Sequence, residues 1–534
     1  MSKKINCLSP PMITTDIFSC ALILFSLTLL LLTILHSENL YQLDRGEKTN
    51  ESLEKHFSKI VKTPKWYQVI ARNTSGRKLK MARVRVTNTS SDEHHDVYGD
   101  EIDIVDVHYE QAFDVKWSNL YPEWIDENSS KCPNIPMPKY EDYDELDVVV
   151  ADVSCGRNSR DVLRLQLNLA VANVLVKCGR TMDVNGVDNG RLLAVFTGSC
   201  DPMWEIFSCE DILWHEGNTW IYMPDMEKLK QKVIMPVGSC QLAPPIPQQR
   251  KNVRNKPKEA YVTVLHSSED YLCGAIVLAQ SIIRSNSTKD LILLADDSIS
   301  QKSRQGLKAA GWKIKLIKRI RSPYAEIETY NEWNYSKLRI WQLTEYDKLI
   351  FIDSDFLVLR NTDKFFDYPQ LSAAGNSRYL FNSGFMLVEP SRCTFRNFMK
   401  RRFEVASYNG GDQGFLNEML MWWHRWPTKL NFLKDFSSVS EDYMHETIPD
   451  DVYALHYLGL KPWMCHRDDY DCNWDIPENK RFASDLAHKM WWQVNKEMSN
   501  ELRDYCVFNP EMEDRIKMHI AKPTSVRQLP FSQY

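Results

Sequence analysis

The 534-residue chain lacks any long block of basic residues, and its formal net charge is −5. Proteins that bind nucleic acid meet phosphates with clustered Lys and Arg side chains, so this composition argues against a nucleic-acid partner. The cysteines show no zinc-finger spacing with histidines, which argues against structural zinc. The hydrophobic content of 43% is ordinary for a globular protein, and the length allows two or three domains.

Charge is also absent from residues 17–35, which are largely apolar. A helix of this length spans about 28 Å, close to the hydrocarbon thickness of a bilayer. A cleaved signal peptide is the alternative, but its apolar core is shorter, at about 7–15 residues. Lys3 and Lys4 precede the span, so the positive-inside bias predicts a cytosolic tail over 1–16, a transmembrane signal anchor over 17–35 and a luminal remainder. This is a single-pass type II arrangement.

Cysteines and glycosylation signals agree with an oxidising lumen. Eleven of the 13 cysteines follow the predicted span, where disulfides can persist. Cys465 and Cys472 are predicted to pair locally, as are Cys200 and Cys209. Asn-x-Ser/Thr acceptor sites predict a glycoprotein; they lie at Asn50, Asn73, Asn88, Asn128, Asn286 and Asn334.

The region after the span is predicted to hold two parts. Residues 36–112 are rich in charge, Ser, Thr and Asn, with little apolar periodicity, which predicts a luminal stem. Residues 113–242 contain a strand pattern at 146–153, an apolar helix pattern at 162–176 and a further strand at 192–196. We expect an accessory α/β region there, with no catalytic signature in its sequence.

A linker precedes the last part of the chain. Residues 243–258 combine prolines with consecutive basic residues, which opposes regular packing. From 259 to 534 alternating elements predict an α/β catalytic domain with a largely parallel sheet. The first elements are expected at 260–265 (strand), 274–283 (helix), 291–295 (strand) and 312–317 (strand). Ligands of such sheets bind beyond the carboxyl ends of the strands.

A strand that ends in two aspartates carries the main chemical signal. Residues 351–361 read FIDSDFLVLRN, in which Asp353 and Asp355 bracket Ser354. At a strand end, two carboxylates can converge on one divalent cation that takes oxygen ligands and bridges a diphosphate. A solvated loop end is the ordinary alternative for such a triplet. The leading hypothesis is a nucleotide-sugar transferase.

Other blocks surround the triplet. The first strand runs into VLHSSEDYLCGA, a polar turn containing Leu265 and Tyr271 that can receive a base and ribose. Lys337 precedes the aspartate strand and can grip a phosphate as a point charge. Three later blocks are FNSGFMLVEPS at 381–391, NGGDQGFLNE at 409–418 and LHYLGLKPW at 455–463. Together the blocks resemble glycosyltransferase family 8, the retaining group with a GT-A fold that includes glycogenin and many plant cell-wall enzymes.

The resemblance, which covers roughly residues 260–480, implies a Rossmann-like mixed sheet and a metal-dependent donor site. Asp353, Asp355 and His456 are expected to bind Mn²⁺, because a nitrogen ligand in an oxygen site favours Mn²⁺ over Mg²⁺. Asn382, Asp412 and Gln413 are expected at the reaction centre. The donor-binding set is Leu265, Tyr271, Lys337, Asp353, Ser354, Asp355, Asn382, Ser383, Asp412, Gln413, His456, Gly459 and Lys461.

Two departures from glycogenin matter. One residue separates Gly459 from Lys461, where glycogenin-like members commonly have two. Asn409 stands where glycogenin carries an aspartate, which leaves a front-face transfer and a double displacement through Asp412 both open.

The block KPWMCHRDDYDCNW at 461–474 closely resembles plant glucuronyltransferases that decorate xylan. That resemblance implies UDP-glucuronic acid as donor, α-1,2 branches on xylan as product, a Golgi location and association with other xylan-synthesis enzymes. The donor carboxylate needs a cation or hydrogen bonds, for which Arg378, His466 and Arg467 are candidates. Trp463 and Trp474 can stack on sugars. The alternatives are a family 8 glucosyl- or galactosyltransferase acting on another glycan and a non-catalytic glycan-binding scaffold.

Overall fold

The computed structural model describes residues 64–73, 78–86, 102–154, 159–180, 191–247, 257–436, 448–465 and 467–506. Every described element belongs to the unit that begins at Pro64. The predicted cytosolic tail and signal anchor lie outside the described residues, as does the middle of the predicted linker. Within the described part of the chain, no helix has both the length and the apolar composition needed to cross a bilayer.

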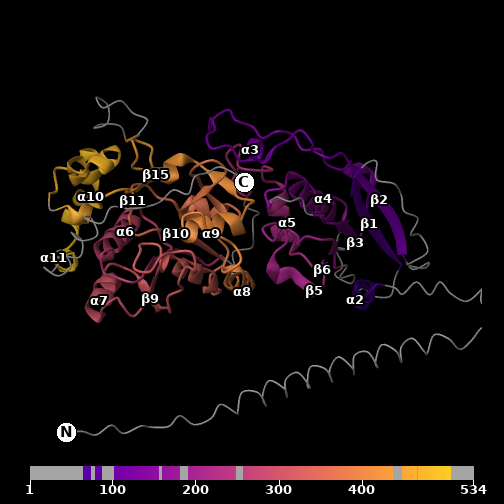
Figure 1. The fold of residues 1–534 in the computed structure, drawn as a ribbon, viewed down its shortest axis with the longest axis horizontal. Helices are drawn as coiled ribbons and strands as arrows, with labels where there is room; N and C mark the ends of the chain where they lie inside the picture. The colour runs from indigo at the N-terminus through magenta and orange to yellow at the C-terminus, as the bar shows by residue number, and fades with distance from the viewer. Residues whose placement is uncertain are drawn as a thin grey trace, which may run out of the picture. The chain divides into compact units, whose positions relative to one another are not determined.

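A six-stranded sheet comes first along the chain, in the order β2-β1-β3-β4-β6-β5. Figure 1 labels all of its strands except β4. The strands are β1 (Leu79–Val86), β2 (Ile102–Tyr109), β3 (Val148–Asp152), β4 (Leu193–Thr197), β5 (Ile212–Glu216) and β6 (Thr219–Tyr222). The helices are α2 (Lys65–Asn73), α3 (Trp117–Leu120), α4 (Val162–Cys178) and α5 (Met226–Val233). The two strands and the helix predicted here are confirmed as β3, β4 and α4. The Asp161 carboxylate caps α4 by accepting the backbone N–H groups of Leu163 and Arg164.

The sheet begins inside the predicted stem. Strands β1 and β2 fall within 36–112 and pair in parallel along their whole length, and β1 also pairs with β3. Charged and apolar residues alternate in both, which is a strand pattern, but the high polar content of the surrounding stretch outweighed it in the prediction. Arg83 of β1 pairs with Asp106 of β2 through two contacts of 2.9 Å, so the polar residues of these strands also belong to the sheet. The ordered α/β structure therefore starts well before residue 113.

A seven-stranded sheet follows in the order β14-β12-β13-β10-β7-β8-β9. In this sheet β13 runs antiparallel to both neighbours, whereas the other pairs are parallel. Its strands are β7 (Glu259–Leu265), β8 (Asp290–Ala295), β9 (Lys313–Leu316), β10 (Lys348–Ile352), β12 (Ser372–Gly375), β13 (Phe381–Val388) and β14 (His424–Trp426). The predicted α/β class, its largely parallel sheet and the first four elements are confirmed.

Helices and a small third sheet complete the unit. The helices are α6 (Leu272–Arg284), α7 (Gln301–Ala309), α8 (Arg392–Arg401), α9 (Asp412–Met419), α10 (Asp485–Glu497) and α11 (Asn500–Asp504). The unit also contains the 3₁₀ helices η5 (Cys209–Asp211) and η6 (Asn334–Gln342). The third sheet has the order β11-β16-β15, with β11 (Phe356–Val358), β15 (Phe432–Leu433) and β16 (Ala454–His456).

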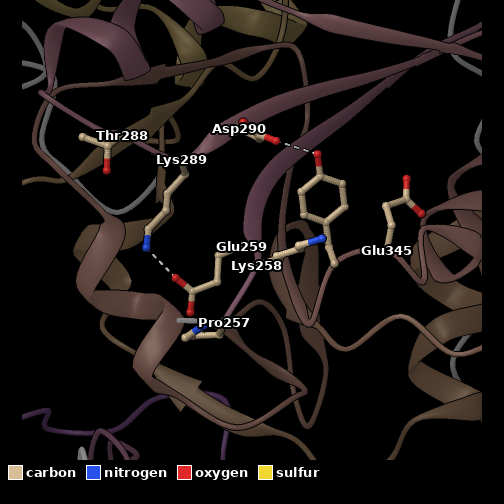
Figure 2. Close-up of a pocket in the computed structure, with 8 residues that line it drawn as sticks. Pro257, Lys258, Glu259, Thr288, Lys289, Asp290 and Glu345 are labelled. Atoms are coloured by element: carbon tan, nitrogen blue, oxygen red, sulfur yellow. Dashed lines mark hydrogen bonds and ion pairs between the residues drawn. The ribbon is translucent and has the colours of Figure 1, made fainter. Parts of the chain in front are cut away.

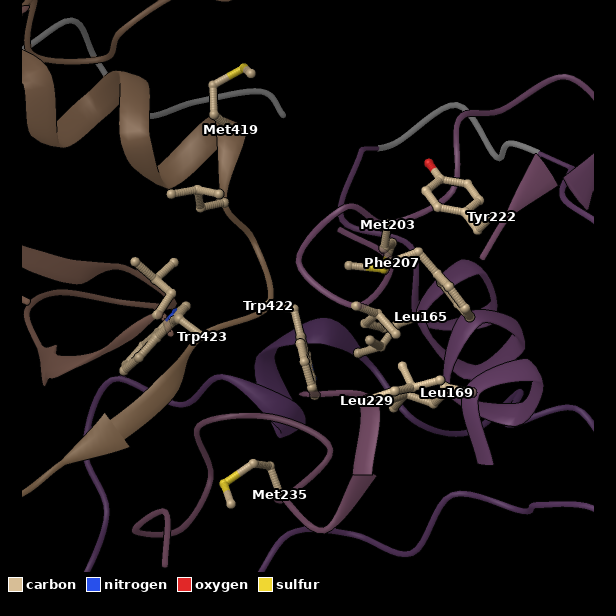
Figure 3. Packing of buried hydrophobic residues seen from close by; sticks show 14 of the residues in the cluster. Leu165, Leu169, Met203, Phe207, Tyr222, Leu229, Met235, Met419, Trp422 and Trp423 are labelled. Atoms are coloured by element: carbon tan, nitrogen blue, oxygen red, sulfur yellow. The ribbon is translucent and has the colours of Figure 1, made fainter. Parts of the chain in front are cut away.

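One apolar core joins the first sheet to the second. Figure 3 shows Trp422, from the chain after α9, lying among Leu165, Leu169 and Leu229 of α4 and α5. The Trp422 indole donates to the carbonyl of Val237 at 3.2 Å. The region predicted as accessory thus shares its hydrophobic core with the region predicted as catalytic.

Four disulfides join described residues: Cys132–Cys240, Cys209–Cys393, Cys273–Cys506 and Cys465–Cys472. The predicted Cys465–Cys472 pair is confirmed. The predicted Cys200–Cys209 pair is wrong, because Cys209 in η5 bonds Cys393 in α8, a residue 184 positions away. Proximity in sequence misled the prediction, since the packing of η5 against α8 decides the partner.

Candidate active site

The strand order of the second sheet reverses between β7 and β10. β8 and β9 follow β7 on one side, whereas β10 lies on its other side. Ligands of α/β sheets bind beyond the carboxyl ends of the strands at such a switch point. β7 ends at Leu265 and β10 at Ile352, so Asp353 begins the turn above this point. The Asp353 N–H donates to the carbonyl of Gly384 at 2.9 Å, which fixes the start of that turn against β13.

Asp353, Asp355 and His456 converge at the switch point. One ligand atom from each lies within 4.8 Å of the others. The strand pairing explains this convergence, because Phe356 of β11 stands opposite His456 of β16. The two rings stack with centroids 4.1 Å apart, which fixes the imidazole beside Asp355. Residues about a hundred positions apart in sequence are thereby brought together.

Two observations show that these residues fit a divalent cation. Asp355 Oδ1 is buried with no hydrogen-bond partner, and His456 Nε2 is 3.5 Å away from it. Gly384 also leaves room, because a Cβ there would lie 2.9 Å from Asp353 Oδ2 and 3.0 Å from His456 Cε1. Two carboxylates and an imidazole match the oxygen and nitrogen ligands of first-row divalent metals. The group can therefore hold a metal ion.

His456 is oriented as a metal ligand requires. Its Nδ1 lies 3.2 Å from Asn431 Oδ1, an acceptor that assigns the ring proton to Nδ1 and leaves the Nε2 lone pair facing Asp355. Burial lowers the pKa of His456 to about 4, although Asp355 opposes that shift. The imidazole is accordingly neutral near pH 7, the form that binds metals.

Lys337 and Lys461 flank the two aspartates. The Lys337 ammonium lies 3.3 Å from Asp353 Oδ1 and 2.6 Å from Asp412 Oδ2. Lys461 lies 2.8 Å from Asp355 Oδ2 and donates to the carbonyl of Tyr457. Both lysines are buried. Two cations thus stand beside three carboxylates, an arrangement suited to a diphosphate and its counter-ion.

The two aspartates differ in protonation. Burial raises the pKa of Asp353 to about 7; Lys337 opposes this shift, and Asp355 and Asp412 add to it. Burial acts the same way on Asp355, but Lys461 and His456 outweigh it and hold the Asp355 pKa below its ordinary value. Asp355 is therefore the permanent anion of the pair, and a bound cation would favour ionisation of Asp353 as well.

Ser383 connects the predicted reaction-centre residues. Its hydroxyl donates to Asp412 Oδ2 at 2.8 Å, and its N–H donates to Gln413 Oε1 at 3.1 Å. Asn382 accepts the N–H of Gly384 at 2.9 Å and donates to Asn376 at 3.2 Å. Strand β13 and the first turn of α9 are thereby locked together beside Asp353.

Asn409, which stands where glycogenin carries an aspartate, has a structural role. Its Oδ1 accepts the N–H groups of Gly411 and Gly414 at 3.0 and 3.2 Å, and the Ser407 hydroxyl at 3.0 Å. It stabilises the turn into α9 and gives that helix a fixed start.

The local backbone conformation requires a glycine at Gly459. Its φ is +72°, a conformation that favours glycine, and a Cβ would lie 2.4 Å from Asn473 Oδ1. Asn473 in turn binds both backbone groups of Leu460, at 2.7 and 2.9 Å. This clamp fixes the segment that carries Lys461.

The remaining predicted residues lie around the same point. Leu265 ends β7 in a buried position, and Tyr271 precedes α6. The carbonyl of buried Ser354 would lie 2.5 Å from a Cβ at Gly274, so only glycine lets α6 approach the aspartate turn. Trp463 is 3% exposed and donates to the carbonyl of Asp270 at 2.7 Å. Trp463 is a core residue, and its predicted role in sugar stacking is wrong.

The residues predicted to bind the donor's carboxylate lie in different segments of the chain. Arg378 lies in the turn that leads into β13, four residues before Asn382, and has a φ of +50°. The Arg467 guanidinium lies 5.0 Å from the centre of the Tyr470 ring. His466 lies outside the described residues. Trp474 is half-buried, and its indole donates to Asp485 at 3.1 Å.

Sequence reasoning missed two residues at this edge of the sheet. His266 directly follows β7, and burial lowers its pKa to about 4, against the charges of Asp296 and Asp412. Asp296 directly follows β8 and pairs with Arg319 at 2.8 Å. Both come after correctly predicted strands, so the rule about carboxyl ends would have identified them. Asn431 and Gly384, which shape the metal group, carry no comparable signal.

A separate cavity of about 420 Å³ lies at the opposite edge of the sheet (Figure 2). It is lined by Lys258 and Glu259 at the start of β7, by Lys289 and Asp290 at the start of β8, and by neighbouring residues. Tyr346 donates to Asp290 there at 2.7 Å. Because these are the amino ends of parallel strands, the cavity is distinct from the metal group.

The sequence is similar to those of known proteins. Residues 50–240 match the family model described as GUX1-5 N-terminal domain, and residues 262–371 match that of Glycosyl transferase family 8. UDP-glucuronate:xylan alpha-glucuronosyltransferase 2 of Arabidopsis thaliana is 48% identical over 429 residues, covering 75% of this chain and 71% of that protein. Glycogenin-1 of Homo sapiens is 29% identical over 256 residues, covering 44% of this chain and 71% of that protein.

The site and these matches define the class of protein, a family 8 glycosyltransferase with a candidate metal centre. Within that class, the chain belongs to the family of the Arabidopsis UDP-glucuronate:xylan alpha-glucuronosyltransferases.

Proposed function

We propose that the protein transfers glucuronic acid from UDP-glucuronic acid to the xylan backbone, forming α-1,2 branches. The observation that carries the proposal is the convergence of Asp353, Asp355 and His456 between two buried lysines at the switch point of the sheet. A relative named UDP-glucuronate:xylan alpha-glucuronosyltransferase, 48% identical over 75% of the chain, supports the choice of donor and acceptor. The sheet with its metal group is consistent with a GT-A fold.

Asp353, Asp355 and His456 would hold Mn²⁺, which their mixed oxygen and nitrogen ligands favour over Mg²⁺. Bound there, Mn²⁺ supplies Lewis-acid neutralisation of the departing UDP. Lys337 and Lys461 lie beside the same carboxylates, so their ammonium groups stabilise charge that develops on the diphosphate. Arg378, in the turn before Asn382, is the proposed partner of the donor's carboxylate.

Asp412 favours a front-face transfer over a double displacement. Its Oδ2 already accepts from the Lys337 ammonium at 2.6 Å and from the Ser383 hydroxyl at 2.8 Å, which makes it a poor nucleophile. In the proposed reaction the acceptor hydroxyl attacks the sugar carbon on the face from which UDP departs. Asp412 and Ser383 then hold the donor sugar in place.

The proposed location is the Golgi membrane, with residues 17–35 as a type II anchor and the catalytic part in the lumen. The uncharged span and the lysines before it support this orientation, and the four disulfides agree with an oxidising compartment. Glycosylation in the lumen and association with other xylan-synthesis enzymes belong to the same proposal.

The test is donor selection by the purified full-length chain. The protein is incubated with Mn²⁺, xylohexaose and, separately, UDP-glucuronic acid, UDP-glucose, UDP-galactose or UDP-xylose, and the product is mapped by mass spectrometry. We expect transfer from UDP-glucuronic acid, its loss in Asp353→Ala, and its retention in Asp103→Ala, which removes an exposed carboxylate from β2. Transfer from another donor alone would replace the assignment, and no transfer by folded protein would favour a glycan-binding scaffold.

A further inference from the structure

Exposed aromatic and aliphatic side chains gather in two short segments near the metal group. Of the eleven large hydrophobic side chains that are exposed in the described part of the chain, five lie at 324–330 and 403–408. They are Tyr324, Ile327, Tyr330, Phe403 and Tyr408, and Tyr330 is 73% exposed. We call this set the aromatic shelf. Exposed apolar groups gathered in this way commonly mark a binding surface.

Hydrogen bonds fix the two segments against each other. The Tyr324 hydroxyl donates to the carbonyl of Phe403 at 2.9 Å, and the Ser322 hydroxyl donates to that of Gly410 at 2.6 Å. The Asn331 amide donates to the carbonyl of Asn409 at 2.7 Å. The shelf is therefore a preorganised surface rather than a pair of independent loops.

Both ends of the shelf connect to the proposed donor site. At one end, Asn331, the residue after Tyr330, accepts through Oδ1 from the amide of Asn334 at 2.9 Å, three residues before Lys337. At the other end, the Tyr408 hydroxyl accepts from Gln413 Nε2 at 2.9 Å, and Gln413 Oε1 accepts the N–H of Ser383. Tyr330 and Tyr408 thus lie on segments that lead into the proposed donor site.

We propose that the aromatic shelf binds the acceptor glycan, with Tyr330 and Tyr408 stacking on successive sugar rings of a β-1,4-linked chain. The proposal rests on the proposed function, which supplies a polymeric acceptor that must cross the surface bordering the metal group. Pyranose rings have apolar C–H faces and polar edges, and tyrosine likewise combines an apolar face with a hydroxyl group. A fixed row of exposed rings continuous with the donor site suits such a chain.

The test separates acceptor from donor binding in steady-state kinetics with xylobiose, xylotetraose and xylohexaose. In the wild-type protein we expect KM to fall as the acceptor lengthens. Tyr330→Ala and Tyr408→Ala should each raise KM for xylohexaose about tenfold, with a smaller effect on KM for UDP-glucuronic acid, and should weaken the dependence on length. Tyr330→Phe keeps the ring and should restore KM to within about threefold of wild type. Phe113→Ala is the control, because it removes a ring about as exposed as that of Tyr330 from the region before the linker.

The outcomes distinguish the two proposals. Wild-type transfer with unchanged acceptor KM in both alanine variants would overturn the shelf and keep the transferase. An equal rise in donor and acceptor KM would also overturn it, since it would show general damage to the site. If the wild-type protein transfers only to a different β-linked glycan and the alanine variants raise that KM, the shelf is kept and the xylan assignment is overturned.

Discussion

At the scale of single residues, the metal group shows how far sequence reasoning reaches. Asp353, Asp355 and His456 were predicted from short motifs, and the structure brings them together. The motifs could not reveal Asn431, which orients His456. They also could not reveal Gly384, whose lack of a side chain leaves space beside Asp353 and His456. Neither residue has a side chain with distinctive chemistry, and each acts only through its three-dimensional neighbours.

Replacing Lys337 should change catalytic efficiency and metal affinity in opposite directions. Lys337→Met removes the ammonium shared by Asp353 and Asp412. We expect kcat/KM to fall about 100-fold, as for loss of one preorganised charge contact. The affinity of the nucleotide-free protein for Mn²⁺ should rise, because a competing cation has left Asp353.

Calorimetric titration with Mn²⁺ and steady-state kinetics measure the two effects. Lys289→Met is the matched control, since Lys289 pairs with Glu259 at the opposite edge of the sheet (Figure 2). Weaker Mn²⁺ binding by Lys337→Met would show that the lysine supports the metal group and does not compete with the cation.

The acceptor sites for glycans should differ in occupancy. Asn334 begins η6, three residues before Lys337; it is half-buried, and its amide donates to Asn331 at 2.9 Å. Asn128 and Asn286 are exposed. Glycopeptide mapping of active protein should find Asn334 unmodified and the other two available. Full occupancy at Asn334 would contradict a donor site at Lys337.

His424 should make stability depend on pH. It is fully buried in β14 with neither ring nitrogen hydrogen-bonded, and burial, with a contribution from Lys232, lowers its pKa to about 3. The unfolded chain binds this proton near pH 6.5, so its contribution to stability is complete above pH 6.5 and is lost as the pH falls toward 3. At pH 4.5 the loss is about 3 kcal/mol.

Urea unfolding at pH 7 and 4.5 measures this difference. His424→Phe should lose about 2–3 kcal/mol less than wild type between the two pH values, because the other titrating groups are shared and cancel. His215→Gln, which changes an exposed histidine, should follow the wild-type curve. Equal losses in wild type and His424→Phe would show that His424 is not the titrating group.

At the scale of elements, buried strands and helices were predictable, whereas strands with polar faces and pairings across the chain were not. Strands β3, β4, β7 and β8 read as apolar runs and were found at their predicted positions. Strands β1 and β2 were missed although their residues alternate in polarity, because the stretch around them is highly charged and only the fold shows that these charges pair across the sheet. The register of β11 with β16, which brings His456 to Asp355, depends on tertiary packing and leaves no periodic trace in the sequence.

Gly459 tests how that packing holds Lys461. Gly459→Ala places a Cβ at positive φ and against Asn473, so the segment that carries Lys461 must shift. We expect kcat/KM to fall about 10–100-fold, since a displacement of about 1 Å can have an effect of this size. Gly217→Ala is the matched control, because its φ is +57° but nothing lies within 4 Å of the added Cβ. The control should lose about 1 kcal/mol of stability from backbone strain and keep its activity.

Kinetics and thermal unfolding of both variants separate the two effects. Equal activity in Gly459→Ala and Gly217→Ala would show that the Asn473 clamp does not position Lys461.

At the scale of the whole molecule, the proline-rich linker marks a change in composition but not a break in packing. The Glu205 carboxylate accepts the N–H groups of Met421 and Trp422 at 2.7 and 3.1 Å, and Cys209 is bonded to Cys393. Arg160 pairs with Glu418 at the end of α9 at 2.7 Å. Composition reports where a chain changes character, whereas these contacts depend on which faces meet after folding. The region before the linker therefore supports α9, the helix that begins at Asp412.

Removing the region before the linker should consequently destabilise the region after it. A fragment of residues 257–534 would expose Trp422 and Trp423, each 1% exposed in the structure (Figure 3), and would leave Cys393 without its partner. Exposure of one large apolar side chain costs about 1.5–3 kcal/mol, so losing this interface removes a substantial part of a domain's stability. We expect the fragment to aggregate or to unfold well below residues 64–534, and the longer protein to unfold in one transition. Two separate calorimetric transitions in the longer protein, with the upper one matching a soluble, active fragment, would show instead that the regions fold independently.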